Sequence, residues 1–195
     1  MAVDNAQIVS DSLLLFKRLG QLPEPVSNPY IIAVSGLPGT GKSYLSRKLL
    51  ERLPAVLLES DALRKMLFPS PDYTSTESIH LFAAIHLLLG RLLGAGIPVI
   101  LDATNLSERN REYLYSIAEH NGTRLILVQV EAPPEVVKQR LQLRRTQTGS
   151  NSDADWAVYL KLKPTVNRIR RRHYTIDTSR DITEPLGKIV REALD

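Results

Sequence analysis

The most constraining feature of the chain is the stretch "GLPGTGKS", which runs from Gly36 to Ser43. It follows the short apolar run "YIIAVS" and precedes a segment with leucines at helical spacing. Glycines here let backbone N–H groups approach a ligand without an intervening side chain. Lys42 and Ser43 add an amine and a hydroxyl at the start of a helix, where the partial positive charge favours anions. A strand, this loop and a helix together predict a cradle for nucleotide phosphates.

The loop also predicts the cofactors, ATP and Mg²⁺. Lys42 would reach the outer phosphates, and Ser43 would offer its hydroxyl to magnesium. Asp102 ends the apolar stretch "VILD" and would support the metal directly or through water. The alternative interpretations are a plain glycine turn before a helix, and an Asp102 that only caps the next turn. The predicted nucleotide-binding residues are Gly36, Leu37, Pro38, Gly39, Thr40, Gly41, Lys42, Ser43 and Tyr44.

Apolar runs that alternate with helical patterns predict the fold class. The expected strands are Tyr30–Ser35, Ala55–Ser60, Ile97–Asp102, Arg124–Val130 and His173–Asp177. Because these runs are nearly continuous in apolar residues, they favour burial on both faces. The prediction is a single α/β P-loop NTPase domain, with a five-stranded parallel sheet and helices on both faces. We expect an N-terminal helix and linker over residues 1–28 and the domain over residues 29–195, with a helical lid at about 140–165.

Helical spacing places the remaining elements. Residues 4–20 are expected to form the extra N-terminal helix, before the proline-containing linker "GQLPEPVSNP". Thr74 and Glu77 form a capping box that opens a long apolar helix. Other helical markers are Leu45, Leu49 and Leu53 after the loop; Tyr113, Leu114, Ile117 and Ala118 after a Ser107 cap; Pro133 and Pro134; and Leu186, Ile189, Val190 and Ala193 at the end. In the N-terminal helix, Ile8, Val9, Leu13 and Phe16 are expected to share one side.

Composition narrows the class of protein. The 195 residues suit one domain, and the absence of cysteine excludes disulfides and cysteine-ligated metals. The formal charge of +4 would suit an anionic substrate. The N-terminal stretch lacks the basic start and cleavage site of a signal peptide. His86 and Arg91 interrupt the most apolar run, so we expect a buried helix, no membrane span and a cytoplasmic location.

The stretch "LLESDALRKMLF" bears on what lies beyond the terminal phosphate. Asp61 follows the second expected strand, and ligands bind at the carboxyl edge of open parallel sheets. A carboxylate there can accept a hydroxyl proton, and Arg64 one turn later can hold an anionic group of an acceptor. A hydrolase does not need this pair. The alternative is that Asp61 only caps the helix that carries Arg64.

Four motifs in this order are similar to those of P-loop kinases related to the phage polynucleotide 5′-kinase domain and the zeta-toxin kinases. They are "GLPGTGKS", "SDALR", "VILDATNLSERNR" and "VVKQRLQLRR", within residues 30–177. The resemblance implies a general base at Asp61, a substrate-binding Arg64 and an Asp102 at the floor of the site. It places Arg140 and Arg144 in a lid over the phosphates. The chain departs from the phage enzyme by its extra N-terminal helix and by lacking a phosphatase domain.

The resulting expectation is a kinase that transfers the γ-phosphoryl of ATP to a hydroxyl of a small-molecule or nucleotide acceptor. A polynucleotide 5′-hydroxyl kinase is one alternative, and an ATPase or regulatory nucleotide-binding module is another. No [NT]-K-x-D motif is present, which disfavours a GTP switch. The six basic residues between Lys161 and Arg172 make nucleic acid possible, but a solvated face is favoured. The histidines form no metal pattern, Trp156 is expected to pack, and the oligomeric state stays open.

Overall fold

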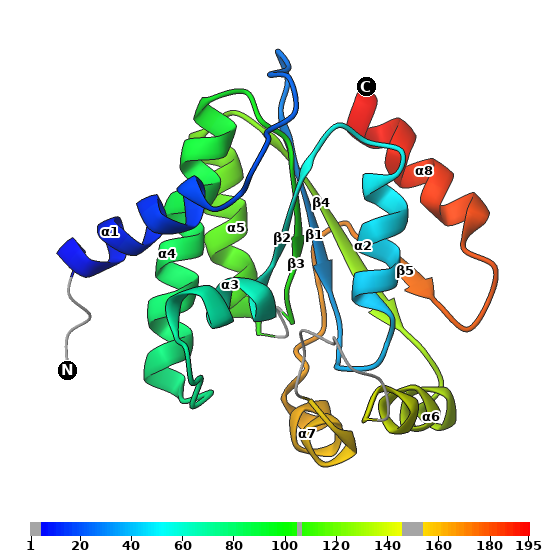
Figure 1. Cartoon of the computed structure of the whole chain (residues 1–195). Coiled ribbons are helices and arrows are strands. Elements are labelled where there is room, and N and C mark those ends of the chain that lie inside the picture. Colours follow the sequence, from blue (N-terminus) through cyan, green and yellow to red (C-terminus); the bar gives the residue numbers. More distant parts are fainter. Residues whose placement is uncertain (1–4, 105–106, 146–153) are drawn as a thin grey trace.

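The computed structural model describes residues 5–104, 107–145 and 154–195. Its sheet contains β1 (Tyr30–Ser35), β2 (Val56–Glu59), β3 (Val99–Asp102), β4 (Arg124–Glu131) and β5 (Tyr174–Asp177). The strands lie in the order β2-β3-β1-β4-β5, and every paired strand is parallel (Figure 1). The predicted five-stranded parallel sheet is therefore confirmed. The carboxyl ends of all five strands lie at the same edge of the sheet, and β1 is the central strand.

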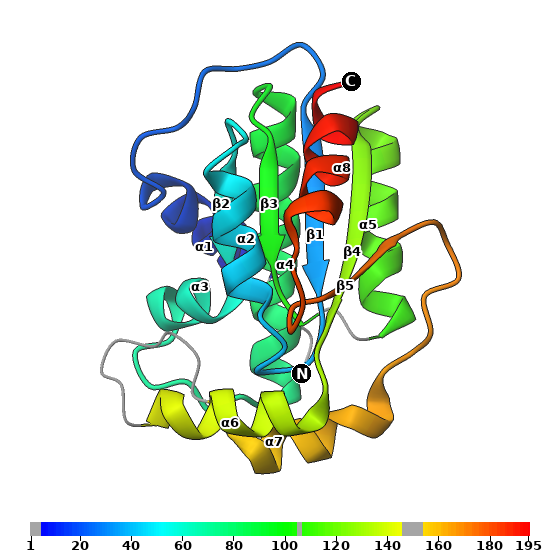
Figure 2. The ribbon, with the colours of Figure 1, turned by 90° about the vertical axis from the view of Figure 1, so that its right-hand side faces the viewer.

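Helices cover both faces of this sheet, as predicted. They are α1 (Asn5–Lys17), α2 (Lys42–Leu50), α3 (Ser60–Leu67), α4 (Ser75–Gly94), α5 (Glu108–His120), α6 (Pro134–Arg145), α7 (Trp156–Leu162) and α8 (Thr183–Leu194), with a short 3₁₀ turn at Lys163–Thr165. Helices α2 and α8 lie on one face, and α4 and α5 lie on the other (Figures 1 and 2). Alternate β1 residues enter separate cores, with Ile31 in one and Ile32 in the other. This two-sided burial explains why the strand sequences are apolar without alternation.

Helices α6 and α7 lie below the carboxyl edge of the sheet (Figure 2). They form a small separate core from Val137, Leu141 and Tyr159, against which Leu37 of the glycine loop packs. Trp156 stacks on Tyr159 with ring centroids 4.7 Å apart, so its expected packing role is confirmed. The segment predicted as a lid, about 140–165, includes residues 146–153, which lie outside the described residues.

Helix α4 is the one helix in the described ranges that is long and apolar enough to cross a membrane. One side of it is buried in the domain, including Leu81, Ile85 and Leu88. It begins after Thr74, whose hydroxyl accepts a hydrogen bond from the Glu77 N–H (3.2 Å). The Glu77 carboxylate accepts a hydrogen bond from the Asp72 N–H (2.8 Å), two residues before the cap.

Helix α1 differs from the sequence prediction in length and in its buried side. It ends at Lys17 and buries Ile8, Ser12 and Leu15, whereas Val9 and Leu13 are exposed. The difference arises from tertiary packing, because α1 packs against α4 and α3 through the side of the helix that contains Ser12. Asp11 on α1 also contacts His80 on α4, with 2.6 Å between Oδ2 and Nε2.

Candidate phosphate-binding and transfer site

The glycine loop connects β1 to α2 and is closely surrounded. A Cβ atom at Gly36 would lie 2.4 Å from the Val130 carbonyl oxygen. Gly41 adopts φ = 96°, and a Cβ atom there would lie 2.7 Å from Thr178 Oγ1. Both positions therefore exclude side chains. The loop closes on itself where the Thr40 hydroxyl donates to the Leu37 carbonyl (2.8 Å).

Lys42 begins α2 and turns its amine toward the loop. Its Nζ donates to the Leu37 carbonyl oxygen at 3.2 Å. Loss of hydration around the half-buried side chain lowers the pKa of Lys42, while the nearby carboxylates of Asp102 and Asp61 oppose this effect. The first-turn N–H groups of α2 have no acceptors within the helix, so this end of α2 presents donors and positive potential to an anion.

Asp102 is the last residue of β3, which pairs directly with β1. Its side chain is 6% exposed and accepts a hydrogen bond from the Ser43 hydroxyl. Burial raises the pKa of Asp102, and the Lys42 amine and the Ser43 hydroxyl act in the opposite direction. The cap of α5 is Ser107, whose hydroxyl accepts from the Asn110 N–H. Asp102 is therefore bonded to Ser43 and is not the cap of α5, while residues 105 and 106 of the turn that follows it lie outside the described residues.

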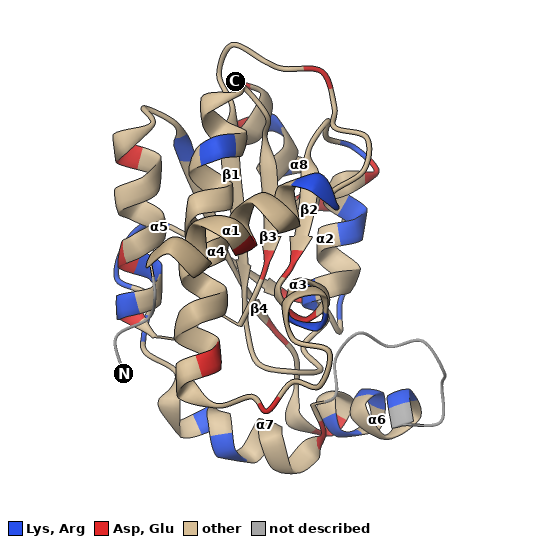
Figure 3. Cartoon of the chain, turned by 60° about the vertical axis from the view of Figure 1, so that its left-hand side comes forward, with Lys and Arg blue, Asp and Glu red and all other residues tan. Residues whose placement is uncertain are grey.

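Asp61 lies where β2 passes without a break into α3. Glu59 occupies the N-cap position of α3, so Asp61 is in the first helical turn and is not the cap. Its carboxylate is half-buried and lies close enough to Lys42 and Asp102 to influence both pKa values. Figure 3 shows acidic residues at the carboxyl ends of β2 and β3. The structure thus brings Lys42, Asp61 and Asp102 together.

Arg64 has a different environment from the one expected of an arginine that grips an anionic acceptor. Its guanidinium forms an ion pair with Glu77 through NH1, and NH2 donates to the Ser78 hydroxyl (3.2 Å). The Arg64 and Glu77 side chains are only 8% and 9% exposed, and the Tyr73 ring lies 5.1 Å from the guanidinium carbon. A buried carboxylate therefore already balances the charge that was predicted to hold the acceptor.

Arg140 and Arg144 lie one turn apart on α6 but have different neighbours. Arg140 donates to the Thr178 hydroxyl (2.8 Å) and to the Thr178 carbonyl (2.9 Å). Thr178 in turn donates to the Thr40 carbonyl (2.5 Å). Arg144 lies close enough to Lys42 for its charge to lower the pKa of that amine. Arg140 is thus bonded to Thr178, whereas Arg144 lies near Lys42, and the expectation that both arginines reach the phosphates stays a prediction.

Two residues of this site, Thr178 and Glu77, were not predicted from the sequence to belong to it. Thr178 follows β5, and a single threonine after a strand carries no recognisable signal. Glu77 was identified only as half of a capping box, and its pairing with Arg64 depends on how α3 and α4 pack.

The donor set fits magnesium bound together with a nucleotide. Among the described residues, no group of three or more His, Cys, Asp or Glu side chains could hold a metal by itself. Magnesium needs few protein ligands, because it keeps several waters and takes phosphate oxygens. Ser43 and Asp102 supply a hydroxyl and a carboxylate beside the loop. The glycines leave the space that phosphate oxygens require.

The parallel sheet, the glycine loop and the adjacent acidic edge define a P-loop NTPase domain of kinase-like fold. The chain belongs to the AAA_33 family of AAA domains, whose family model matches residues 31–169. Its relation to the phage polynucleotide kinase domain and the zeta toxins in particular stays a prediction.

Solved structures and a curated relative support the kinase-like fold. A gluconokinase from Sinorhizobium meliloti 1021 is 26% identical, with a TM-score of 0.58 over 85% of this chain and 90% of its own. The APS kinase of Mycobacterium tuberculosis, solved with AMPPNP and APS, is 19% identical, with a TM-score of 0.61 over 88% of this chain and 100% of its own. Rat (Rattus norvegicus) 6-phosphofructo-2-kinase/fructose-2,6-bisphosphatase 1 is 24% identical over 165 aligned positions, and the match covers 75% of this chain. The chain spans only 35% of that relative's length.

Proposed function

We propose that the protein is an ATP- and magnesium-dependent kinase that transfers the γ-phosphoryl group to a hydroxyl of a small-molecule or nucleotide acceptor. The observation that carries the proposal is the proximity of Asp61 to Lys42 and Asp102 at the carboxyl edge of the sheet. Nucleotide binding alone requires the loop and Lys42, but not a carboxylate at the end of β2, which lies two strands away from β1 in the sheet. The kinase names among the similar proteins agree with this proposal.

The residues divide the work of transfer. The loop N–H groups and Lys42 bind the outer phosphates, and Arg144 adds positive charge near Lys42. Ser43 and Asp102 would hold magnesium, which neutralises charge on the phosphate oxygens. The oxygen of the acceptor hydroxyl forms a bond to the γ-phosphorus, and the bond between this phosphorus and the bridging oxygen of ADP breaks. Asp61 accepts the proton that the hydroxyl loses. Positioning and charge therefore supply most of the catalysis.

Acceptor-dependent ADP release tests the proposal. The assay screens hydroxyl-bearing metabolites and 5′-hydroxyl oligonucleotides, and compares wild type with Asp61→Asn. Asparagine keeps the size of the side chain but cannot take the proton. We expect near-normal ATP affinity and a fall in transfer of roughly 10²–10⁴-fold, the usual contribution of a positioned base.

Glu119→Gln removes an exposed carboxylate on α5 and serves as the matched control, with transfer expected to be unchanged. If Asp61→Asn transferred the phosphoryl group at the wild-type rate, Asp61 would not be the general base. Steady ADP release that no acceptor stimulates, with a tightly bound protein partner, would instead favour the regulatory module.

A further inference from the structure

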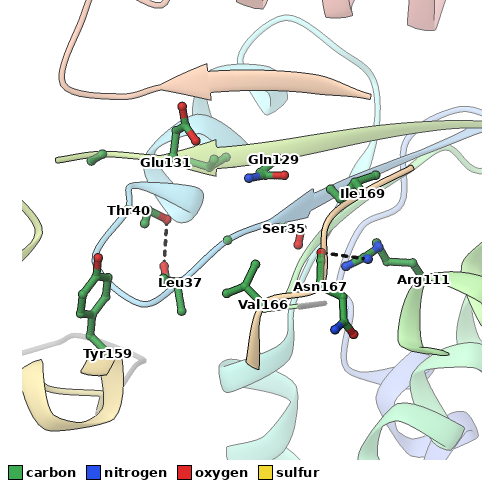
Figure 4. A pocket seen from close by; sticks show the side chains of 13 residues that line it. Ser35, Leu37, Thr40, Arg111, Gln129, Glu131, Tyr159, Val166, Asn167 and Ile169 are labelled. Carbon is green, nitrogen blue, oxygen red and sulfur yellow. Dashed lines mark hydrogen bonds between the residues drawn. The ribbon is translucent and has the colours of Figure 1, made fainter. Parts of the chain in front are cut away.

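A cavity of about 160 Å³ lies beside the start of the glycine loop, on the β4 side of β1 (Figure 4). Its walls come from the ends of β1 and β4, from the loop, from α5 and α7, and from residues 166–169. Gly36, Leu37 and Thr40 of the loop line it, whereas Lys42, Asp61 and Asp102 do not. The cavity therefore adjoins the phosphate-binding loop but does not contain the side chains that we assign to transfer.

Leu37 connects this cavity to the phosphate-binding lysine. The residue lines the cavity, and its carbonyl oxygen accepts the hydrogen bond from Lys42 Nζ at 3.2 Å. Gly36 lines the same space. A ligand in the cavity would thus lie next to the loop that binds the terminal phosphate. Asp61 approaches the same lysine from the β2 side.

Hydrogen bonds to α5 hold the wall formed by residues 166–169. Arg111 on α5 is 3% exposed, and its NH2 donates to the Asn167 carbonyl at 3.1 Å. The Asn167 side chain accepts from the Glu108 N–H, also at 3.1 Å. Figure 4 shows Arg111 and Asn167 on one side of the space and Gln129 and Glu131 of β4 across from them. Such a preformed site reduces the ordering cost of binding.

The cavity is lined by both polar and aliphatic residues. The polar ones are Ser35, Thr40, Arg111, Gln129, Glu131, Tyr159 and Asn167, and the aliphatic ones are Leu37, Val130, Ala132, Val166 and Ile169. Amides, hydroxyls and a carboxylate match ligand hydroxyl groups, which both donate and accept. Aliphatic walls match the C–H faces of a small ring or chain. The volume is well below the ~300–1,000 Å³ typical of sites for drug-sized ligands.

We infer that this cavity is the binding subsite of the acceptor and takes a small polyhydroxylated molecule of the sugar or polyol class. The inference rests on the proposed kinase function and narrows its acceptor. The body of the acceptor lies in the cavity against Gln129, and the reacting hydroxyl extends past Leu37 toward Lys42. The small volume disfavours a nucleotide or an oligonucleotide as the occupant.

Binding without turnover tests the inference separately from the kinase proposal. Ligand-observed NMR with sorbitol, D-glucose and D-gluconate would be recorded in the presence of AMPPNP and magnesium. Val166→Phe fills the cavity from a partly exposed position, and Gln129→Met removes the amide at nearly constant size. We expect at least one probe to bind wild type, Val166→Phe to abolish that binding, and Gln129→Met to weaken it about tenfold through one lost hydrogen bond.

Gln139→Met on the exposed side of α6 is the matched control and should bind the probe as wild type does. Equal probe binding by Val166→Phe and wild type would overturn the inference, as would failure of every polyol probe to bind. An equal loss of AMPPNP affinity in Val166→Phe would assign the cavity to the nucleotide and also overturn it. Probe binding with no phosphoryl transfer would leave the subsite intact and contradict the kinase proposal instead.

Discussion

At the scale of single residues, the two arginines of α6 are one helical turn apart in the sequence but have different neighbours. Arg140 is bonded to Thr178, which is bonded to the Thr40 carbonyl of the loop. Arg144 instead acts electrostatically on Lys42. We therefore interpret Arg140 as a positioning residue for the loop and Arg144 as a residue that stabilises charge during transfer.

This division predicts different kinetic effects. Arg144→Ala should lower kcat by roughly 10²-fold or more, because it removes a charge that acts in the transition state. Arg140→Ala should mainly raise the KM for ATP, by about tenfold, because the loop loses its support. Steady-state kinetics with varied ATP and saturating acceptor would separate the two effects.

Substitutions at Thr178 supply the control for the loop. Thr178→Ser keeps the hydroxyl that links Arg140 to the loop and should retain the wild-type KM, whereas Thr178→Val should resemble Arg140→Ala. If Arg140→Ala lowered kcat as strongly as Arg144→Ala and left KM for ATP unchanged, Arg140 would be a direct contact of the transferred group.

At the scale of elements, α4 carries a titratable group in an apolar setting. His86 lies 5.0 Å from the Tyr113 ring and 6.3 Å from the Phe82 ring, measured between centroids. Burial lowers the pKa of His86 from 6.5 to about 4. The neutral imidazole is thus favoured in the fold, while the unfolded chain protonates it near its ordinary pKa.

The lowered pKa of His86 predicts acid sensitivity of the fold. Between pH 6.5 and about 4 the unfolded state binds a proton that the folded state does not, so stability decreases as the pH falls through this window. From pH 7 to pH 5 the contribution of His86 to the loss of unfolding free energy should be about 1–2 kcal/mol. Urea unfolding of wild type and His86→Gln at both pH values measures it.

The comparison uses differences between pH values, so any uniform cost of the substitution cancels. His120→Gln removes an exposed histidine at the end of α5 and should leave the wild-type pH dependence in place. A pH dependence of His86→Gln that equals that of wild type would show that His86 does not titrate with a lowered pKa.

Elements were predictable where their sequence signal matched their final environment. Strand β1 could be identified because burial on both faces makes it almost uniformly apolar, whereas the edge strand β5 buries only Ile176 and gives a weaker signal. Asp61, Ser43 and Asp102 could be selected because each lies near the carboxyl end of a strand or the start of a helix after one. The buried side of α1 could not be predicted from the sequence, because Ser12 is buried and Val9 is exposed only as a result of how α1 crosses α4. The pairing of Arg64 with Glu77 likewise depends on two helices meeting.

At the scale of the whole molecule, the parallel sheet gathers the polar chemistry at one edge. The chain as a whole has a formal net charge of +4. The basic run from Lys161 to Arg172 begins in the last turn of α7 and ends shortly before β5. Within this run, Arg171 pairs with Glu112 (2.9 Å) and Arg172 pairs with Glu192 (2.8 Å).

These ion pairs predict weak binding of nucleic acid. A strand that used Arg171 and Arg172 would have to displace Glu112 and Glu192, so fewer charges of the run are available for phosphates. We expect the Kd for a single-stranded 5′-hydroxyl oligonucleotide to lie in the roughly 10⁻⁶–10⁻⁴ M range of non-specific binding at physiological salt. Fluorescence anisotropy at several salt concentrations measures both the affinity and the slope of log K against log salt.

The salt slope identifies which residues are responsible. If weak binding arises from the exposed arginines of the run, the double variant Arg168→Gln/Arg170→Gln should reduce the slope of log K against log salt. The reduction should correspond to the loss of up to about two phosphate contacts. Arg52→Gln, an exposed change just after α2, should leave the slope unchanged. Submicromolar and strongly salt-dependent binding would contradict the expectation, because counterion release would then require a built phosphate track. That result would favour the polynucleotide 5′-hydroxyl kinase over a small polyhydroxylated acceptor.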